Sequence, residues 1–315
     1  MLDLTRLRVL AAVAEHGSVT AAAKALHYAQ PSVSHHLARL EAETGAVLLR
    51  RVGRGVRLTE AGTLLAQRAQ EIIGRVEAAE AVLAEHVGLR AGTVRLAAFP
   101  SALSTLIPAA AARMRTAHPA LRLELTEAEP PEALAQLRAG EVDAAVIFRH
   151  RPEQGSGDRA DGADLRLTPL GEDRLHLVGP AAKRWPARLD AHTDADWIAG
   201  CERCRAHLLW LCAEAGFTPR IRFTTDDYVA VQALVVAGLG MTVLPELALR
   251  AHRDPGVRTR PLGGSARELL LARYGRSPDA PGVDAVADAL LASTAAPSNA
   301  APAPRAAGRT SSSAR

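Results

Sequence analysis

The sequence contains few cysteines, few aromatic residues and no long apolar segment. Its three cysteines are too few for a disulfide framework, so we expect an intracellular chain with reduced thiols. Phe, Trp and Tyr make up only 3% of the 315 residues, which argues against binding of single-stranded nucleic acid by base stacking. Two glycines, a proline and a glutamate interrupt the most apolar stretch, residues 234–249. The sequence therefore predicts no transmembrane helix.

Targeting and catalytic motifs are also missing from the sequence. Asp3, Arg6 and Arg8 interrupt the first apolar pattern, which is contrary to a secretory signal. There is no G-x-S-x-G or HExxH motif, no phosphate-binding P-loop and no complete dinucleotide-binding glycine fingerprint. We therefore expect no enzymatic activity, no cofactor and no bound metal.

Positive charge is concentrated near the N-terminus and is supplied mainly by arginine. The formal net charge is +4, and Lys24 and Lys183 are the two lysines. Residues 1–60 hold eight basic residues against five acidic ones, and residues 50–57 hold four arginines and no acid. A basic module joined to a nearly neutral body predicts a polyanionic partner for that module. The alternative is a solvated basic face.

The first sixty residues predict three helices followed by a hairpin, the pattern of a winged helix-turn-helix. Apolar residues at helical spacing indicate a first helix that ends at Gly17, and Ser18 is a suitable N-cap for a second, alanine-rich helix. Pro31 fits the first turn of a third helix, which Gly45 ends. The outward face of the third helix carries short polar and basic side chains, which can reach base edges in the major groove of DNA.

Residues 50–58 predict a hairpin, because two glycines separate short apolar positions. Its arginines would contact the phosphates that flank the groove. The alternative for the three helices and the hairpin together is a small helical dimerisation unit with a solvated face.

A long helix is predicted after the hairpin. Thr59 is its expected N-cap, and an apolar pattern that extends to Val87 predicts about thirty residues without a break. Such a length is typical of a helix that pairs with another helix. A long helix packed on its own domain is the alternative, and Gly88 and Gly92 indicate a hinge or linker after it.

Strands and helices alternate in the remainder of the chain. The order strand-helix-strand-helix-strand over residues 93–148 predicts a parallel sheet with helical crossovers. Further strands are expected at residues 165–170, 174–178, 221–225, 241–244 and 267–274, and further helices at 204–215, 228–237 and 283–291. This layout fits two similar α/β lobes, with crossings near residues 168 and 266. The tail, residues 295–315, is expected to be disordered because it is rich in Ala, Pro, Ser and Arg.

Several motifs occur in a fixed order along the chain. In the N-terminal part these are SVTAAAKAL at residues 18–26, QPSVSHHL at 30–37, Leu40-Glu41 with Gly45, and RLTEAG at 57–62. In the body they are AGF at residues 215–217 and AGLGMTVLP at 237–245. This set resembles the LysR-type transcriptional regulators over about residues 1–294. Ala29 stands where the family usually has Ser and His35 where Arg is frequent, and these departures leave the operator sequence open.

The resemblance implies an α+β multidomain fold and a function in transcription. It implies a winged helix-turn-helix DNA-binding domain over residues 1–59, a linker and dimerisation helix over 60–89 and an effector-binding domain over 93–294. The effector-binding domain would have the two-lobed type 2 periplasmic-binding-protein fold, with lobe I at about 93–167 and 267–294 and lobe II at about 168–266. The protein would be a cytoplasmic homodimer or homotetramer that binds an inverted-repeat operator in double-stranded DNA. A small effector, for which an anion is one option, would modulate it from the interlobe cleft, with RNA polymerase as a further partner.

The site residues follow from the motifs and from the expected strand ends. The candidate DNA contacts are Ser18, Thr20, Lys24, Gln30, Pro31, Ser32, Ser34, His35, His36, Arg39, Arg50, Arg51, Arg54 and Arg57. Ligands in open α/β sheets lie beyond the carboxyl ends of strands. The candidate effector contacts are Pro100, Ser101, Ala102, Phe148, Arg149, Gly200, Cys201, Thr224 and Thr225. Helix N-termini near Ser101 and Cys201 would favour an anionic group, and the alternative role for Ser101 is a helix cap.

Two alternative functions remain open at this point. Cys201 and Cys204 form a C-x-x-C motif, and the neighbouring Arg203 and Arg205, with a helix start close by, predict a lowered thiol pKa for Cys201. Some LysR-type regulators sense peroxide through cysteines in the second lobe, so a thiol-based redox-sensing regulator is one alternative. Zinc binding is disfavoured because a fourth ligand is missing from the local spacing. A cytoplasmic small-molecule-binding protein or enzyme on the same two-lobed fold is the alternative from another class.

Overall fold

The computed structural model describes residues 2–52, 55–86, 92–150, 165–275 and 279–295. Its N-terminal domain consists of α1 (Leu4–His16), α2 (Val19–Ala25), α3 (Gln30–Thr44) and the hairpin β1 (Leu49–Val52) and β2 (Gly55–Leu58). The predicted helix signals are confirmed. The Ser18 Oγ accepts a hydrogen bond from the Ala21 N–H at 3.0 Å, and Gly17 and Gly45 end α1 and α3 with φ of +66° and +67°. The winged helix-turn-helix is therefore built by the local signals that predicted it.

The long helix α4 (Glu60–His86) follows directly and has 27 residues. Thr59 caps it as predicted, since its Oγ1 accepts from the Gly62 N–H at 3.0 Å. The helix packs on α1, while Ile72 and Leu83 of its predicted pairing face remain exposed. These two side chains therefore leave apolar surface uncovered within one chain, as pairing with a second helix requires. Val87 and Gly88 lie outside the described residues.

A close helix contact joins α4 to the C-terminal domain. Gly74 of α4 faces the end of α7 (Pro130–Ala139), and a Cβ at Gly74 would lie 1.3 Å from the Ala139 carbonyl oxygen. Beside it, the Arg75 guanidinium donates to the carbonyl oxygens of Leu137 and Arg138 at the end of α7. Glycine is therefore required at position 74 for α4 and α7 to approach this closely.

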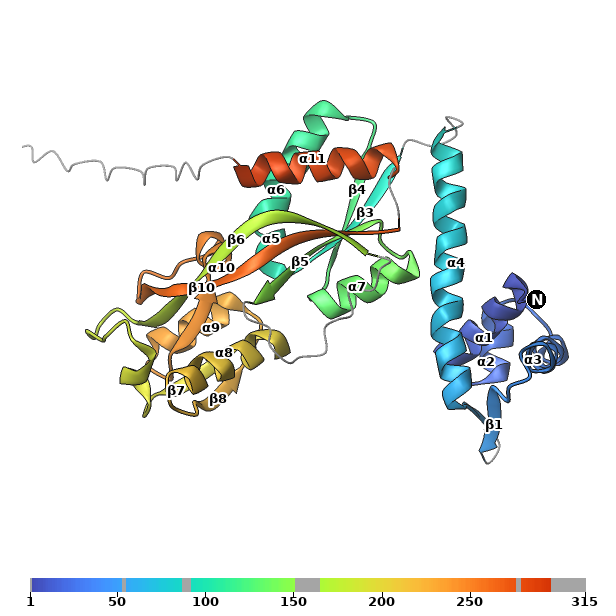
Figure 1. The fold of residues 1–315 in the computed structure, drawn as a ribbon, viewed down its shortest axis with the longest axis horizontal. Coiled ribbons are helices and arrows are strands. Elements are labelled where there is room, and N and C mark those ends of the chain that lie inside the picture. Colours follow the sequence, from blue (N-terminus) through green and yellow to red (C-terminus); the bar gives the residue numbers. More distant parts are fainter. Residues whose placement is uncertain (1, 53–54, 87–91, 151–164, 276–278, 296–315) are drawn as a thin grey trace, which may run out of the picture.

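The C-terminal domain is built on a six-stranded mixed sheet (Figure 1). Its strand order is β4 (Arg122–Glu127), β3 (Thr93–Ala98), β5 (Ala144–His150), β10 (Val257–Tyr274), β6 (Leu165–Pro180) and β9 (Thr242–Pro245). β3 pairs in parallel with β4 and β5, as the sequence predicted. β10 pairs antiparallel with both β5 and β6, and β6 pairs antiparallel with β9. A second, parallel sheet joins β7 (Asp196–Ala199) and β8 (Arg220–Thr224).

Helices cover the faces of these sheets. They are α5 (Pro100–Leu103), α6 (Leu106–Ala117), α7, α8 (Glu202–Glu214), α9 (Tyr228–Val236), α10 (Glu246–Ala251) and α11 (Pro281–Ala295). We refer to β3, β4 and β5 with α5, α6, α7 and α11 as lobe I, and to β7, β8 and β9 with α8, α9 and α10 as lobe II. β6 and β10 run through both lobes (Figure 1). The boundaries predicted near residues 168 and 266 therefore fall inside continuous strands.

Several predicted elements differ from the observed ones. The strands predicted at 165–170 and 174–178 are one strand, β6, whose pairing with β10 shifts near Gly171, a residue with φ of +136°. The helix predicted after β3 is divided into α5 and α6, and the strand predicted at 267–274 is the last part of β10. β7 and α10, which have four and six residues, were not predicted. The loop at 151–164 and the tail at 296–315 lie outside the described residues.

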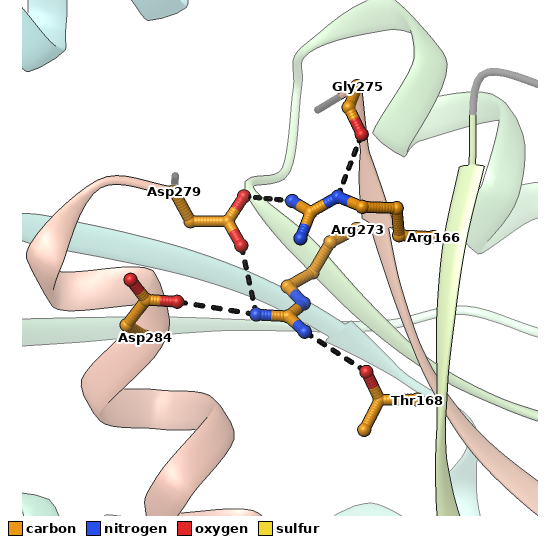
Figure 2. Close-up of polar contacts among 6 residues, drawn as sticks. All are labelled: Arg166, Thr168, Arg273, Gly275, Asp279 and Asp284. Atoms are coloured by element: carbon orange, nitrogen blue, oxygen red, sulfur yellow. Dashed lines mark hydrogen bonds and ion pairs between the residues drawn. The ribbon is translucent and has the colours of Figure 1, made fainter. Parts of the chain in front are cut away.

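A polar cluster fixes the start of β6 and the end of β10 to α11 in lobe I (Figure 2). Arg166 and Arg273 lie directly opposite each other in the antiparallel pair, where like charges are destabilising. Asp279 accepts from both guanidiniums, and Asp284 accepts from Arg273 at 3.3 Å. The carboxylates therefore neutralise the arginine pair and hold this end of the two long strands in place.

Candidate DNA-binding surface and interlobe site

The outward face of α3 is exposed and polar. Gln30, Pro31, Ser32, Ser34, His35 and Arg39 are exposed, and so are Thr20 and Lys24 of α2, while His36 and Ser18 are half-buried. On the opposite face of α3, Val33, Leu37 and Leu40 are buried, as predicted. Tyr28 stacks on His36 with ring centroids 6.0 Å apart. Tyr28 was not among the predicted contacts, although an exposed aromatic residue in the turn before α3 is a signal for it.

Two arginines face each other on the hairpin. Arg50 of β1 lies directly opposite Arg57 of β2, so their side chains share one face. Both are exposed, and neither forms an ion pair with a carboxylate among the residues that the structure describes. Because like charges at directly opposite positions are destabilising, a phosphate between them would relieve this repulsion. The side chain of Arg51 and all of Arg54 lie outside the described part.

Glu41 and Thr59 fix the hairpin relative to α3. The Glu41 Oε1 accepts hydrogen bonds from the N–H groups of Leu48 at 2.7 Å and Leu49 at 3.1 Å. The Thr59 Oγ1 donates to the Val47 carbonyl oxygen at 2.7 Å. The polar face of α3 and the arginines of the hairpin are therefore held in one fixed arrangement.

Two small cavities lie where lobe I meets lobe II. One, of about 30 Å³, is lined by Glu129 of lobe I and by residues of lobe II that include Gly200, Cys201, Thr225 and Tyr228. The other, of about 20 Å³, is lined by residues that include His150, Cys204, His207 and Arg267. A single water needs roughly 10–15 Å³ by this measure. These two cavities therefore hold at most very small molecules.

The predicted effector residues are only partly brought together. Gly200, Cys201 and Thr225 line the larger interlobe cavity. Ala102 and Phe148 are buried in the core of lobe I instead, Pro100 and Arg149 are half-buried, and Thr224 is exposed at the end of β8. Sequence reasoning missed Glu129, although it directly precedes α7 and follows β4, where the same strand-end rule applies.

Ser101 belongs to a buried polar network. Its Oγ accepts a hydrogen bond from the Arg267 Nη2 at 2.6 Å. The Arg267 Nε donates to the Asp173 Oδ2 at 2.8 Å, and both charged side chains are 1% exposed. The Asp173 Oδ1 accepts from the Leu247 N–H at the start of α10. The alternative role of Ser101 as a helix cap was wrong, because Phe99 is the N-cap of α5 and α5 has only four residues.

Two pairs of polar side chains meet at the boundary between lobe I and lobe II. The hydroxyl of Tyr228 at the start of α9 lies near that of Ser101, and the carboxyl of Glu129 lies near the thiol of Cys201. Burial raises the pKa of Tyr228 to about 12, and burial also raises the pKa of the Glu129 carboxyl. Tyr228 and Glu129 therefore remain uncharged at the interlobe boundary more readily than they would in water.

The two cysteines of the C-x-x-C motif lie next to each other. The Cys201 Sγ donates to the Cys204 Sγ at 3.1 Å, and both are free thiols. The hydrogen bond from Cys201 and the positive charge of Arg267 lower the pKa of the Cys204 thiol, whereas the hydrogen bond to Cys204 and burial raise the pKa of Cys201. The prediction of a lowered pKa at Cys201 was therefore wrong, and Cys204 is the more acidic thiol.

A pair of histidine rings also crosses the interlobe boundary. His150 at the end of β5 stacks on His207 of α8 with ring centroids 4.0 Å apart and an interplanar angle of 10°. Burial, reinforced by His207 and Arg267, lowers the pKa of His150 to about 2. Burial lowers the pKa of His207 to about 4. Both rings are therefore neutral near pH 7.

Comparison with known proteins identifies the family. Residues 4–63 match the family described as "Bacterial regulatory helix-turn-helix protein, lysR family", and residues 88–295 match "LysR substrate binding domain". The chain belongs to the LysR family. It is a DNA-binding transcriptional regulator with an α+β multidomain fold, as the sequence motifs predicted. No helix among the described residues combines the length and the apolar character that a membrane span needs.

Relatives within the LysR family are similar over most of the chain. The "Hydrogen peroxide-inducible genes activator" of Dickeya chrysanthemi is 26% identical over 80% of this chain and 82% of its own length. The "Uncharacterized HTH-type transcriptional regulator YcgK" of Bacillus subtilis (strain 168) is 29% identical over 81% of this chain and 83% of its own. The crystal structure of ArgP from Mycobacterium tuberculosis has the same fold, with a TM-score of 0.64 and 22% identity, over 94% of this chain and 98% of ArgP. The first two of these relatives are named as a genes activator and a transcriptional regulator and not as enzymes, in agreement with the expectation from the sequence.

Proposed function

We propose that this LysR-family regulator reads duplex DNA with α3 and the hairpin, and that a small effector at the interlobe boundary controls it. The exposed polar face of α3 beside the opposed Arg50 and Arg57 supports the DNA-binding part most directly. A polar helix in the major groove reads base edges, while arginines on a hairpin bind phosphates. DNA is in the cytoplasm of a bacterium, so we also place the protein there.

We propose that two copies act together on an inverted repeat. Ile72 and Leu83 leave an apolar stripe of α4 uncovered within one chain, and pairing of two such helices would bury it. Two recognition helices would then meet two half-sites related by the symmetry of the dimer. A tetramer would arise from two such dimers, and RNA polymerase would be the partner at the promoter.

We propose that effector control acts through the contacts that cross between the lobes. A ligand changes a conformational equilibrium only by its different affinity for the two states. The Ser101–Tyr228 and Glu129–Cys201 contacts, together with the stacked rings of His150 and His207, favour the arrangement seen here. The two cavities have volumes of about 30 and 20 Å³, so entry of an effector larger than a few atoms would require these contacts to separate.

The DNA-binding part is tested by fluorescence anisotropy on the promoter DNA of the protein's own gene and on a scrambled duplex, over a series of salt concentrations. Affinity for both should fall steeply with salt, because phosphate contacts release counterions. Arg57→Gln should weaken binding to both duplexes alike, whereas Ser34→Ala should change the preference between them. Arg188→Gln, an exposed arginine paired with Asp190 in lobe II, is the control for lost charge. Equal effects of Ser34→Ala on both duplexes would contradict the assignment of α3.

The effector part is tested with Tyr228→Phe, which removes the hydroxyl that lies near Ser101 at the interlobe boundary and keeps the ring. We expect the variant to bind operator DNA with a changed footprint length or bend, measured by nuclease protection. The unchanged head domain should preserve the salt dependence of binding. An unaltered footprint would contradict control through interlobe closure.

A thiol-based redox sensor is the second candidate function, and the 3.1 Å separation of the Cys201 and Cys204 sulfurs favours it. The similarity to proteins named hydrogen peroxide-inducible genes activators also supports it. The Cys204 thiolate would attack one peroxide oxygen and become a sulfenic acid as hydroxide leaves. The Cys201 thiol would then displace water from that sulfur to form a disulfide, so that two thiols and one peroxide give one disulfide and two waters.

Mass spectrometry after mild peroxide treatment tests this function. We expect a Cys201–Cys204 disulfide, and sulfenate at Cys204 alone in Cys201→Ser. Cys212 is an internal control, because it is buried and burial raises its pKa to about 12. Absence of a disulfide and of a sulfenate at both positions would remove the redox function.

A further inference from the structure

A basic hollow on lobe II is not used by any contact described above. A cavity of about 540 Å³ is lined by Arg184, Trp185, Pro186, Arg258 and Arg260. This volume lies within the range of small-molecule sites, roughly 300–1,000 Å³, and far exceeds that of either interlobe cavity. We call these five residues the basic hollow.

The strand pair β6–β10 builds the floor of the basic hollow. Gly179 of β6 lies opposite Arg258 of β10, and a Cβ at Gly179 would lie 2.8 Å from the Trp185 indole. Glycine at this position therefore lets the chain turn back after β6 and lay the indole against the strand. The Trp185 Nε1 donates to the Pro180 carbonyl oxygen at 3.1 Å, which fixes the ring.

Three guanidinium groups converge on this floor. Arg258 and Arg260 alternate with Thr259 along β10, so their side chains point to the same face. The Arg258 Nη2 donates to the Ala181 carbonyl oxygen at 3.1 Å, which holds that guanidinium in place. Arg184 joins them from the segment after β6. The arrangement is therefore partly preorganised by the backbone.

Among the described residues, no carboxylate lines the basic hollow, and neither Arg184 nor Arg260 forms an ion pair with a carboxylate. Arginine does not lose its proton in proteins, so three positive charges persist at neutral pH. A ligand with one negative charge would neutralise only one of them. The planar guanidinium fork matches phosphate oxygens in a bidentate manner, and the indole offers an apolar surface to a flat ring.

We propose that the basic hollow binds an organic polyphosphate, with its phosphates on Arg184, Arg258 and Arg260 and its ring against Trp185. The segment after β6 and the beginning of β10 lie at the end of the C-terminal domain farthest from α4 and the DNA-binding domain (Figure 1). This position favours a small ligand over the DNA that the same chain reads. The basic hollow is therefore a second ligand-binding site, separate from the interlobe cavities.

Isothermal titration calorimetry on the full-length protein tests the proposal, with ADP, pyrophosphate and adenosine as probes. We expect ADP to bind and pyrophosphate to bind more weakly, because pyrophosphate has no ring to pack against Trp185. Adenosine should not bind, because it has no phosphate for the arginines. Arg184→Gln and Arg260→Gln should each weaken ADP binding roughly tenfold, because each removes a charge-assisted hydrogen bond to phosphate. Both side chains are exposed, so these variants should fold normally.

Arg188→Gln is the matched control, because it removes an exposed positive charge from the same segment but outside the basic hollow. Unchanged ADP affinity in this variant supports the site. Absence of ADP binding at millimolar concentration overturns the proposal, and so does equal weakening by Arg188→Gln. Loss of random-duplex DNA binding in Arg184→Gln and Arg260→Gln, without any ADP binding in the wild type, would assign the surface to nucleic acid instead.

Discussion

Replacement of Arg267 by methionine should strongly destabilise the protein. Arg267 is 1% exposed, donates to Asp173 at 2.8 Å and to Ser101 at 2.6 Å, and lies 4.4 Å from the centre of the Phe148 ring. Methionine fills much of the same space but leaves the Asp173 carboxylate buried, with the Leu247 N–H as its remaining donor among the described residues. Removal of one partner of a buried ion pair costs about 3–5 kcal/mol, so the free energy of unfolding should fall by about that amount.

Urea unfolding followed by circular dichroism measures this loss. The double variant Arg267→Met/Asp173→Asn should recover about 1–3 kcal/mol, because it removes the uncompensated charge and keeps an acceptor for Leu247. Arg260→Met, an exposed position on the same strand, should change stability by less than about 0.5 kcal/mol. The reasoning fails if Arg267→Met costs less than about 1 kcal/mol, or if the double variant is no more stable than the single one.

Three further variants test other parts of the structure. Gly74→Ala should separate α4 from α7, because its Cβ would meet the Ala139 carbonyl oxygen at 1.3 Å; small-angle scattering should show an expanded chain, and an unchanged profile would contradict the contact. Glu41→Ala should loosen the hairpin and cost about 1–3 kcal/mol, because the Leu48 and Leu49 N–H groups lose their acceptor; an unaltered melting temperature would refute this. A histidine in an unfolded chain has a pKa of about 6.5, whereas burial lowers the pKa of His150 to about 2. Acid therefore protonates the unfolded state first, and the free energy of unfolding falls as the pH drops below about 6.5. His150→Leu should flatten this fall in thermal melts from pH 8 to pH 5, and a variant as acid-sensitive as the wild type would argue against a buried neutral ring.

The N-terminal domain could be predicted from the sequence because its signals are local. Gly17 and Gly45 need a positive φ, and Ser18 and Thr59 each bond to an N–H three residues ahead. Each signal lies within one turn of the helix end that it controls. A single sequence is therefore sufficient to place these helices within a residue or two.

The interlobe site could be predicted only in part, because its contacts join distant segments. Arg267 bonds to Asp173 and to Ser101 from positions 94 and 166 residues away. An arginine in an otherwise apolar strand was a signal of a buried partner, but nothing in the sequence identified that partner. The strand-end rule found Cys201 and Thr225, which line the cavity, and also Phe148, which the packing of lobe I buries.

The contact between α4 and α7 has a consequence for signal transfer. Gly74 and Arg75 attach lobe I to the long helix, while lobe II is joined to lobe I by β6 and β10. We expect a rotation of lobe II about these two strands to leave the attachment of lobe I undisturbed. Such a rotation would therefore not directly move the DNA-binding domain of the same chain. We expect the conformational change of lobe II to be transmitted through contacts with a neighbouring subunit. The regulator would then respond to its effector only as an oligomer.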